Sequence, residues 1–161
     1  MYKYVYALDL SLNSTGVCIF NSDGNFVKKL TIDTNGEKNT PQKLKMIAKH
    51  FIELIGKYPP EKVIIEQGFT RYNKSTQQIF RVHGLVNYLF SDYEQKYYPS
   101  SSVKKIVAGR GNIDKEELRR VIKLEYPKIN FDTYDESDAF AVGLAYFIEQ
   151  RSYHGKKNSK K

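Results

Sequence analysis

The first part of the chain alternates short apolar runs with polar turns, a pattern typical of β-strands joined by tight connections. The runs lie at residues 2–9, 16–20 and 26–33. The second turn contains the dipeptide Asp23-Gly24, which favours a hairpin. The pattern therefore predicts an antiparallel meander of strands at the start of the chain.

Beyond this meander, apolar positions recur at helical spacing, and short apolar runs interrupt them. Thr40 and Pro41 favour a helix start, and Pro59-Pro60 ends that helix. The elements expected here are a helix from residue 40, a strand at 62–66, a helix at 75–90, a strand at 97–99, helices at 100–107 and 114–124, and a last helix from 135 through 148. The order βββ-α-β-α-β-α-α-α predicts one α/β domain over residues 1–152, followed by a basic, disordered tail over 153–161.

Length and composition agree with a single globular domain, since 161 residues suffice to bury a core. No apolar run approaches the roughly 20 residues of a membrane helix, and the N-terminus MYKYVYALDL lacks the apolar region of a signal peptide. Cys18 is the only cysteine, which excludes an internal disulfide and a cysteine-based zinc site. We expect it to pack as a small apolar residue on a strand. These features predict a cytoplasmic protein.

The charge of the chain favours a polyanionic partner. Its formal net charge is +8, from 26 Lys and Arg against 18 Asp and Glu. The alternative is a charged, soluble surface with a basic tail. Residues 151–161 carry five of the basic residues and no acid. The charge therefore makes nucleic acid a plausible partner and does not establish it.

Four acids stand beside apolar runs, where a surface charge is not expected. Asp9 and Glu66 each end an apolar strand, and Asp135 and Asp138 open the last helix on neighbouring positions of one face. A buried charge is unfavourable unless it is paired or bound to a cation. Clustered carboxylates repel one another without a cation, and hard oxygen ligands without His or Cys match Mg²⁺ or Mn²⁺.

Each acid also has a structural interpretation, which the residues alone leave open. Asp135 would be favourable at the positive end of a helix, and Glu66 would pair with a basic side chain. Asp9 would accept hydrogen bonds from the Ser/Thr/Gly turn at residues 11–16. These interpretations weaken when the four acids are considered together, because they do not explain why the acids cluster.

Four segments, in this order and spacing, resemble the signature blocks of RuvC-type Holliday junction resolvases. They are ALDLSLNSTG, VIIEQGF, VKKIVAGRGNIDKEEL and DESDAFAVGLAYF, and together they span the chain from Tyr4 to Phe147. The resemblance implies an RNase H-like fold with a mixed five-stranded sheet flanked by helices. It also implies two divalent ions, Mg²⁺ with Mn²⁺ as a substitute, held by catalytic carboxylates at Asp9, Glu66, Asp135 and Asp138.

The resemblance further implies contacts to DNA. By position, Lys104 and Lys115 match basic residues that hold phosphates in the family, and Lys105 and Arg110 are additional candidates in this chain. Phe69 matches an aromatic residue that engages bases at the junction centre. The alternatives are solvated helix charges for the basic residues and a core position for Phe69. The chain departs from the bacterial pattern near Phe69, so the sequence preference for cutting does not transfer.

The function that the resemblance implies is metal-dependent endonucleolytic nicking of four-way and other branched DNA by a homodimer. The compact length of the chain suggests a bacteriophage-type member of the family, acting in a bacterial cell or a phage-infected host. The alternatives are a nucleic-acid-binding protein on the same scaffold that does not cleave, and a nuclease of the same fold that processes RNA. A third alternative, an ATP-binding domain of the actin and sugar-kinase type, requires two such domains, and 161 residues supply only one.

Overall fold

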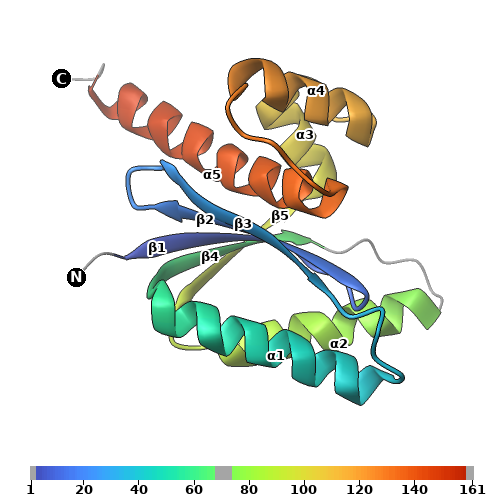
Figure 1. Cartoon of the computed structure of the whole chain (residues 1–161). Helices are drawn as coiled ribbons and strands as arrows, with labels where there is room; N and C mark the ends of the chain where they lie inside the picture. Colours follow the sequence, from blue (N-terminus) through green and yellow to red (C-terminus); the bar gives the residue numbers. More distant parts are fainter. Residues whose placement is uncertain (1–2, 68–73, 159–161) are drawn as a thin grey trace.

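The computed structural model describes residues 3–67 and 74–158, and these form a sheet with helices on both faces (Figure 1). The strands are β1 (Tyr4–Asp9), β2 (Ser14–Asn21), β3 (Phe26–Asp33), β4 (Pro60–Gln67) and β5 (Glu94–Pro99). The helices are α1 (Thr40–Lys57), α2 (Lys74–Leu89), α3 (Ser100–Ala108), α4 (Lys115–Glu125) and α5 (Tyr134–Asn158). None of these helices is both long and apolar enough to cross a bilayer.

The sheet is mixed and has the strand order β3-β2-β1-β4-β5. β1, β2 and β3 pair antiparallel, which confirms the predicted meander, and its hairpin turn at Gly24 has a φ of 87°. β4 and β5 add in parallel on the other side of β1. The carboxyl ends of β1, β4 and β5 therefore lie at the same end of the sheet.

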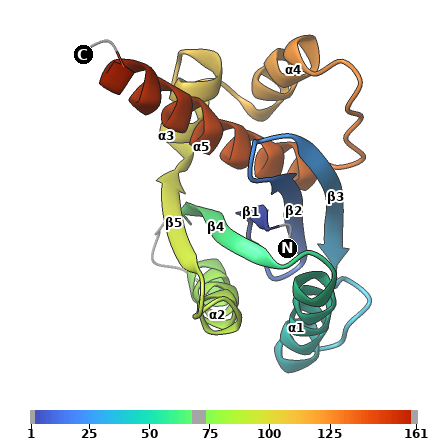
Figure 2. The ribbon, with the colours of Figure 1, turned by 90° about the vertical axis from the view of Figure 1, so that its left-hand side faces the viewer.

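Side-chain alternation divides the sheet into two cores. On β1, Tyr6 and Leu8 face the layer of α1 and α2, whereas Val5 and Ala7 face the layer of α3, α4 and α5 (Figure 2). β4 repeats the pattern, with Ile64 on the α5 side. Because successive strand side chains point to opposite faces, the residues two positions beyond Ala7 and Ile64 also point toward α5.

The helix α5 packs closely on β1 and β2 at two glycines, one on β2 and one on α5. A Cβ at Gly16 of β2 would lie 1.9 Å from the carbonyl oxygen of Asp135, and a Cβ at Gly143 of α5 would lie 2.3 Å from the ring of Phe20. Only hydrogen fits at either position. Cys18, between these contacts on β2, is fully buried as predicted.

Two boundaries differ from the sequence prediction. β5 begins at Glu94 rather than at residue 97, because its polar first residues pair in parallel with β4 from Lys62 onward. Such pairing overrides a weak strand pattern. α5 continues to Asn158, although the segment after residue 152 was expected to be disordered. Extending an existing helix adds one hydrogen bond per residue without a new nucleus, which explains the continuation.

Candidate active site

Asp9 and Glu66 occupy equivalent positions at the ends of neighbouring parallel strands. Leu8 of β1 pairs with Ile65 of β4, so the next residue on each strand is the acid. Both acids continue the alternation that turns side chains toward α5. Adjacent strands lie about 4.8 Å apart, and the two carboxylates therefore share one corner of the sheet.

Asp135 lies at the same corner of the sheet, packed against Gly16. Asp9 pairs with Gly16 across β1 and β2, and the Asp135 backbone lies directly against Gly16. The Asp135 side chain is fixed from the sheet, because Ser14 Oγ donates a hydrogen bond to its Oδ2 at 2.5 Å. The first turn of α5 is thus positioned over the carboxyl end of β1.

Asp138 follows Asp135 by three residues on α5 and is 7% exposed. Its Oδ2 accepts a hydrogen bond from Nζ of Lys115 at 2.5 Å. Lys115 is the first residue of α4, and its side chain remains 60% exposed. A lysine whose side chain is largely exposed therefore neutralises a carboxylate that is almost completely buried.

The carboxylates disfavour one another's charged forms. Burial, followed by the charges of Glu66 and Asp138, raises the pKa of Asp9 well above its ordinary value. Burial also raises the pKa of Glu66 and of Asp138 above their ordinary values, despite the opposing effect of Lys115. Burial alone would lower the pKa of Lys115, but its hydrogen bond to Asp138 and the charges of the nearby acids raise it. The acids in this corner thus outnumber the cations, Lys104 and Lys115, whose charges act on them.

The donor set fits a hard divalent cation, although the side chains are turned toward protein partners. Asp135 faces Ser14 and Asp138 faces Lys115. Within residues 3–67 and 74–158, no three His, Cys, Asp or Glu side chains are grouped as a metal-binding set. The chemistry of the cluster nevertheless suits a divalent cation, because buried carboxylates that also repel one another gain stability from a shared cation.

The sequence prediction missed two hydroxyl groups that orient the acids. Besides Ser14, the side chain of Ser100 hydrogen-bonds Glu66 and lowers the pKa of that acid against the effect of burial. The pairing of Glu66 with Tyr98 brings the start of α3, and with it Ser100, beside β4. Serines at the first position of a strand or a helix are common, so only the register of the strands identifies these two.

A buried ion pair that the sequence prediction also missed fastens the start of α5 to β3. Glu136 is 4% exposed, and its carboxylate accepts a hydrogen bond from Lys29 Nζ at 2.7 Å. Lys29 also pairs with Asp132 at 2.5 Å, and the Glu136 N–H donates to Thr133 Oγ1 at 3.1 Å. Because Glu136 directly follows Asp135, this network holds Asp135 in place. No sequence signal distinguished Glu136 from its acidic and polar neighbours Asp135, Ser137 and Asp138.

The predicted DNA contacts differ in their surroundings. Lys104 lies close enough for its charge to lower the pKa of Glu66 and of Asp138 against the effect of burial. Lys105 is exposed on α3, and Arg110 pairs with Glu117 at 2.5 Å. Phe69 lies outside the described residues.

Comparisons with known proteins agree on one family. The family model described as "Crossover junction endodeoxyribonuclease RuvC" matches residues 5–146. A relative of that name from Ehrlichia chaffeensis is 28% identical over 154 residues, covering 92% of this chain and 99% of that protein. Another from Rhizobium johnstonii is 24% identical over 148 residues, covering 88% of each.

Solved structures share the fold. T. thermophilus RuvC in complex with Holliday junction substrate superposes with a TM-score of 0.79 at 18% identity, covering 93% of this chain and 96% of that one. The yeast mitochondrial Holliday junction resolvase Ydc2 gives 0.67 at 14% identity, covering 97% and 84%. The mixed five-stranded sheet flanked by helices is therefore the RNase H-like architecture that the resemblance implied. The family model covers most of the chain, and the chain belongs to the crossover junction endodeoxyribonuclease RuvC family.

Proposed function

We propose that this member of the RuvC family is a divalent-metal-dependent endonuclease that nicks Holliday junctions and other branched DNA. The observation that carries the proposal is the cluster of Asp9, Glu66, Asp135 and Asp138, in which burial, together with the charges of neighbouring acids, raises the pKa of Asp9, of Glu66 and of Asp138. A chain that only bound DNA would have no use for repelling carboxylates beside a basic surface. Family membership supports DNA junctions over RNA as the substrate.

The four carboxylates would hold two Mg²⁺ ions, or two Mn²⁺ ions in their place. The chemistry that such a pair supplies is activation of the attacking water and stabilisation of the leaving 3′ oxygen. The chain itself contributes positioning: Ser14 orients Asp135, Ser100 orients Glu66, and the Lys29–Glu136 pair anchors the first turn of α5. Lys104 and Lys115 add positive charge where the phosphate would lie.

The acting form would be a homodimer, since a four-way junction presents two equivalent strands to cut. A two-fold symmetric dimer brings two identical sites to such a substrate. The outer face of α2 supports this assembly, because Phe80 is 56% exposed and Tyr88 is 77% exposed. They lie eight residues apart on one side of the helix, with Gly84 open between them. Two copies of this face would bury apolar area that a monomer leaves in water.

The experiment that tests the function compares substrates with and without metal. Synthetic four-way junctions, forks, linear duplexes and RNA are incubated with the protein in Mg²⁺ or in EDTA, and the products are separated on a denaturing gel. We expect nicks near the branch point of junctions in Mg²⁺ only, with weaker nicking of forks. Equal cutting of linear duplex, or cutting of RNA alone, would contradict the proposal. Junction binding without any cleavage would identify a protein that only binds.

A further inference from the structure

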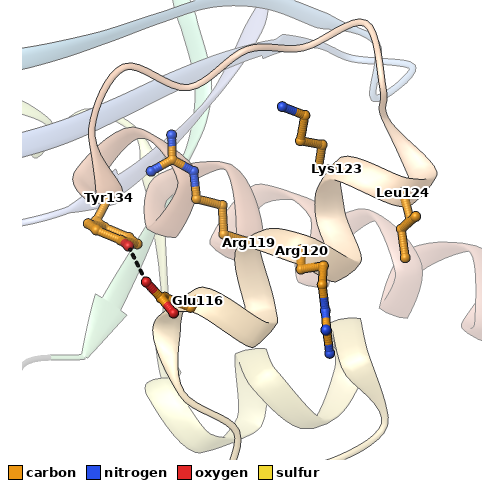
Figure 3. Close-up of a pocket in the computed structure, with 6 residues that line it drawn as sticks. All are labelled: Glu116, Arg119, Arg120, Lys123, Leu124 and Tyr134. Carbon is orange, nitrogen blue, oxygen red and sulfur yellow. Dashed lines mark hydrogen bonds between the residues drawn. The ribbon is translucent and has the colours of Figure 1, made fainter.

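The outer face of α4 is a basic surface that the candidate active site does not account for. The inner face of α4 packs against the core through the buried side chains of Leu118 and Ile122. Away from the core, a shallow hollow of about 560 Å³ is lined by Glu116, Arg119, Arg120, Lys123, Leu124 and Tyr134 (Figure 3). Three of these residues are cations, and only one is an acid.

Part of this surface is fixed in place. Nη2 of Arg119 donates a hydrogen bond to the carbonyl of Phe131, and its guanidinium lies 5.0 Å from the centre of the Tyr134 ring. The hydroxyl of Tyr134 donates a hydrogen bond to Oε1 of Glu116 at 3.2 Å (Figure 3). The one acid among the lining residues therefore already has a hydrogen-bond partner. These contacts join α4 to the segment that leads into α5. Arg119 keeps further N–H donors for another partner, because a guanidinium carries five.

The other two cations are available. Arg120 and Lys123 are exposed, and no hydrogen bond or ion pair engages either of them within the part of the chain that the structure describes. In Figure 3, Arg119 and Lys123 extend on one side of α4 and Arg120 extends on another, so that positive charge wraps around the helix. Exposed charges of this kind are ordinarily solvated. Whether they also bind a ligand depends on where they lie relative to the active site.

Their position links this surface to the acidic cluster. Tyr134, which is 41% exposed, directly precedes Asp135. α4 begins with Lys115 on Asp138 and is about 16 Å long at 1.5 Å per residue. A DNA strand whose phosphate lies at the carboxylates and which leaves past Tyr134 therefore meets Arg119, Arg120 and Lys123 next.

From this arrangement we infer that the outer face of α4 binds the phosphate backbone of one arm of the branched DNA, beyond the phosphate that is cut. The inference rests on the proposed function and adds a second contact region to it. Guanidinium groups bind phosphate oxygens in a planar fork, and lysine adds a point charge. The exposed Tyr134 ring provides an apolar surface against the sugars of the same strand.

The test measures the salt dependence of junction binding in EDTA, where no cleavage occurs. The Arg120→Gln/Lys123→Gln double variant removes two charges from α4. The Lys45→Gln/Lys49→Gln double variant is the matched control, because α1 lies on the opposite face of the sheet (Figure 1). A third variant, Arg120→Lys/Lys123→Arg, keeps the charges and exchanges the groups. Thermal unfolding checks that all three retain the wild-type fold.

We expect the slope of log K against log salt to fall in magnitude by about two in the α4 double variant, because each phosphate contact contributes about 0.9. Affinity at moderate salt should fall about tenfold, whereas the control keeps the wild-type slope and the charge-preserving variant recovers most of the binding. An α4 variant indistinguishable from the control would overturn the inference and leave α4 to a protein partner. If the wild type cleaves junctions in Mg²⁺ while this result is obtained, the inference fails and the proposed function stands.

Discussion

At the scale of single residues, the surroundings of Asp9 disfavour its charged form. Its carboxylate is flanked by Glu66, Asp135 and Asp138, and within residues 3–67 and 74–158 the charge of Lys115 opposes their effect on its pKa. Asp9→Asn keeps the shape and removes one metal-binding charge. We expect it to abolish Mg²⁺-dependent nicking while junction binding, which depends on phosphate contacts, persists.

Asp23→Asn in the β2–β3 turn is the control, because Asn-Gly suits that turn as well as Asp-Gly. Near wild-type nicking by Asp9→Asn would show that Asp9 holds no metal.

The same residue should couple stability to pH in the metal-free protein. A raised pKa means that folded Asp9 keeps its proton when the unfolded chain has already lost it. The free energy of unfolding therefore falls as the pH rises from the ordinary value of 3.8 through the raised pKa of Asp9. Asp9→Asn removes this loss, so its Tm in EDTA should exceed that of the wild type at neutral pH and approach it in acid. About 1 kcal/mol corresponds to roughly 2–4 °C for a domain of this size. A Tm difference that does not depend on pH between acid and neutral conditions would refute this account.

At the scale of elements, the contact between β2 and α5 sets the geometry of the site. A Cβ at Gly16 would lie 1.9 Å from the Asp135 carbonyl oxygen, and backbone on both sides prevents an easy shift. We expect Gly16→Ala to lower the free energy of unfolding by about 1–3 kcal/mol and to reduce nicking more than binding. Gly56→Ala in α1 meets nothing within 4 Å and should be neutral or stabilising. Denaturant titrations and nicking rates measure both variants. Equal stabilities of the two alanine variants would mean that α5 moves freely away from β2.

At the scale of the whole molecule, the exposed face of α2 predicts how two copies meet. Phe80→Asp and Tyr88→Asp each place a charge on that face, and either should raise the dimer dissociation constant at least about tenfold. Ile52→Asp on α1 is the control, because Ile52 is similarly exposed at 59%. Sedimentation equilibrium measures the dissociation constants, and the gel should show loss of paired nicks on opposite strands. A dissociation constant that changes in the control alone would assign the interface to α1.

The sequence by itself determined the meander, the order of the elements and the identity of the four acids, because these depend on local periodicity and on an unusual local context. Asp9 and Glu66 could be recognised since each ends an apolar strand. The phage-type origin, the two ions and the residue roles stay predictions. The sequence also predicted a disordered tail where α5 continues to Asn158, since helix extension depends on the helix before it.

Only the tertiary structure decided which residues meet across the chain. Ser14 and Asp135 are far apart in sequence, as are Lys29 and Glu136, yet each pair is in hydrogen-bond contact. Gly16 ends the first signature block, but the reason for a glycine there follows from the approach of α5 to β2. Register and helix packing are set by burial over the whole sheet rather than by neighbours along the chain. The sequence could therefore name the charged groups, and the packing of α5 on the sheet determined how they are held.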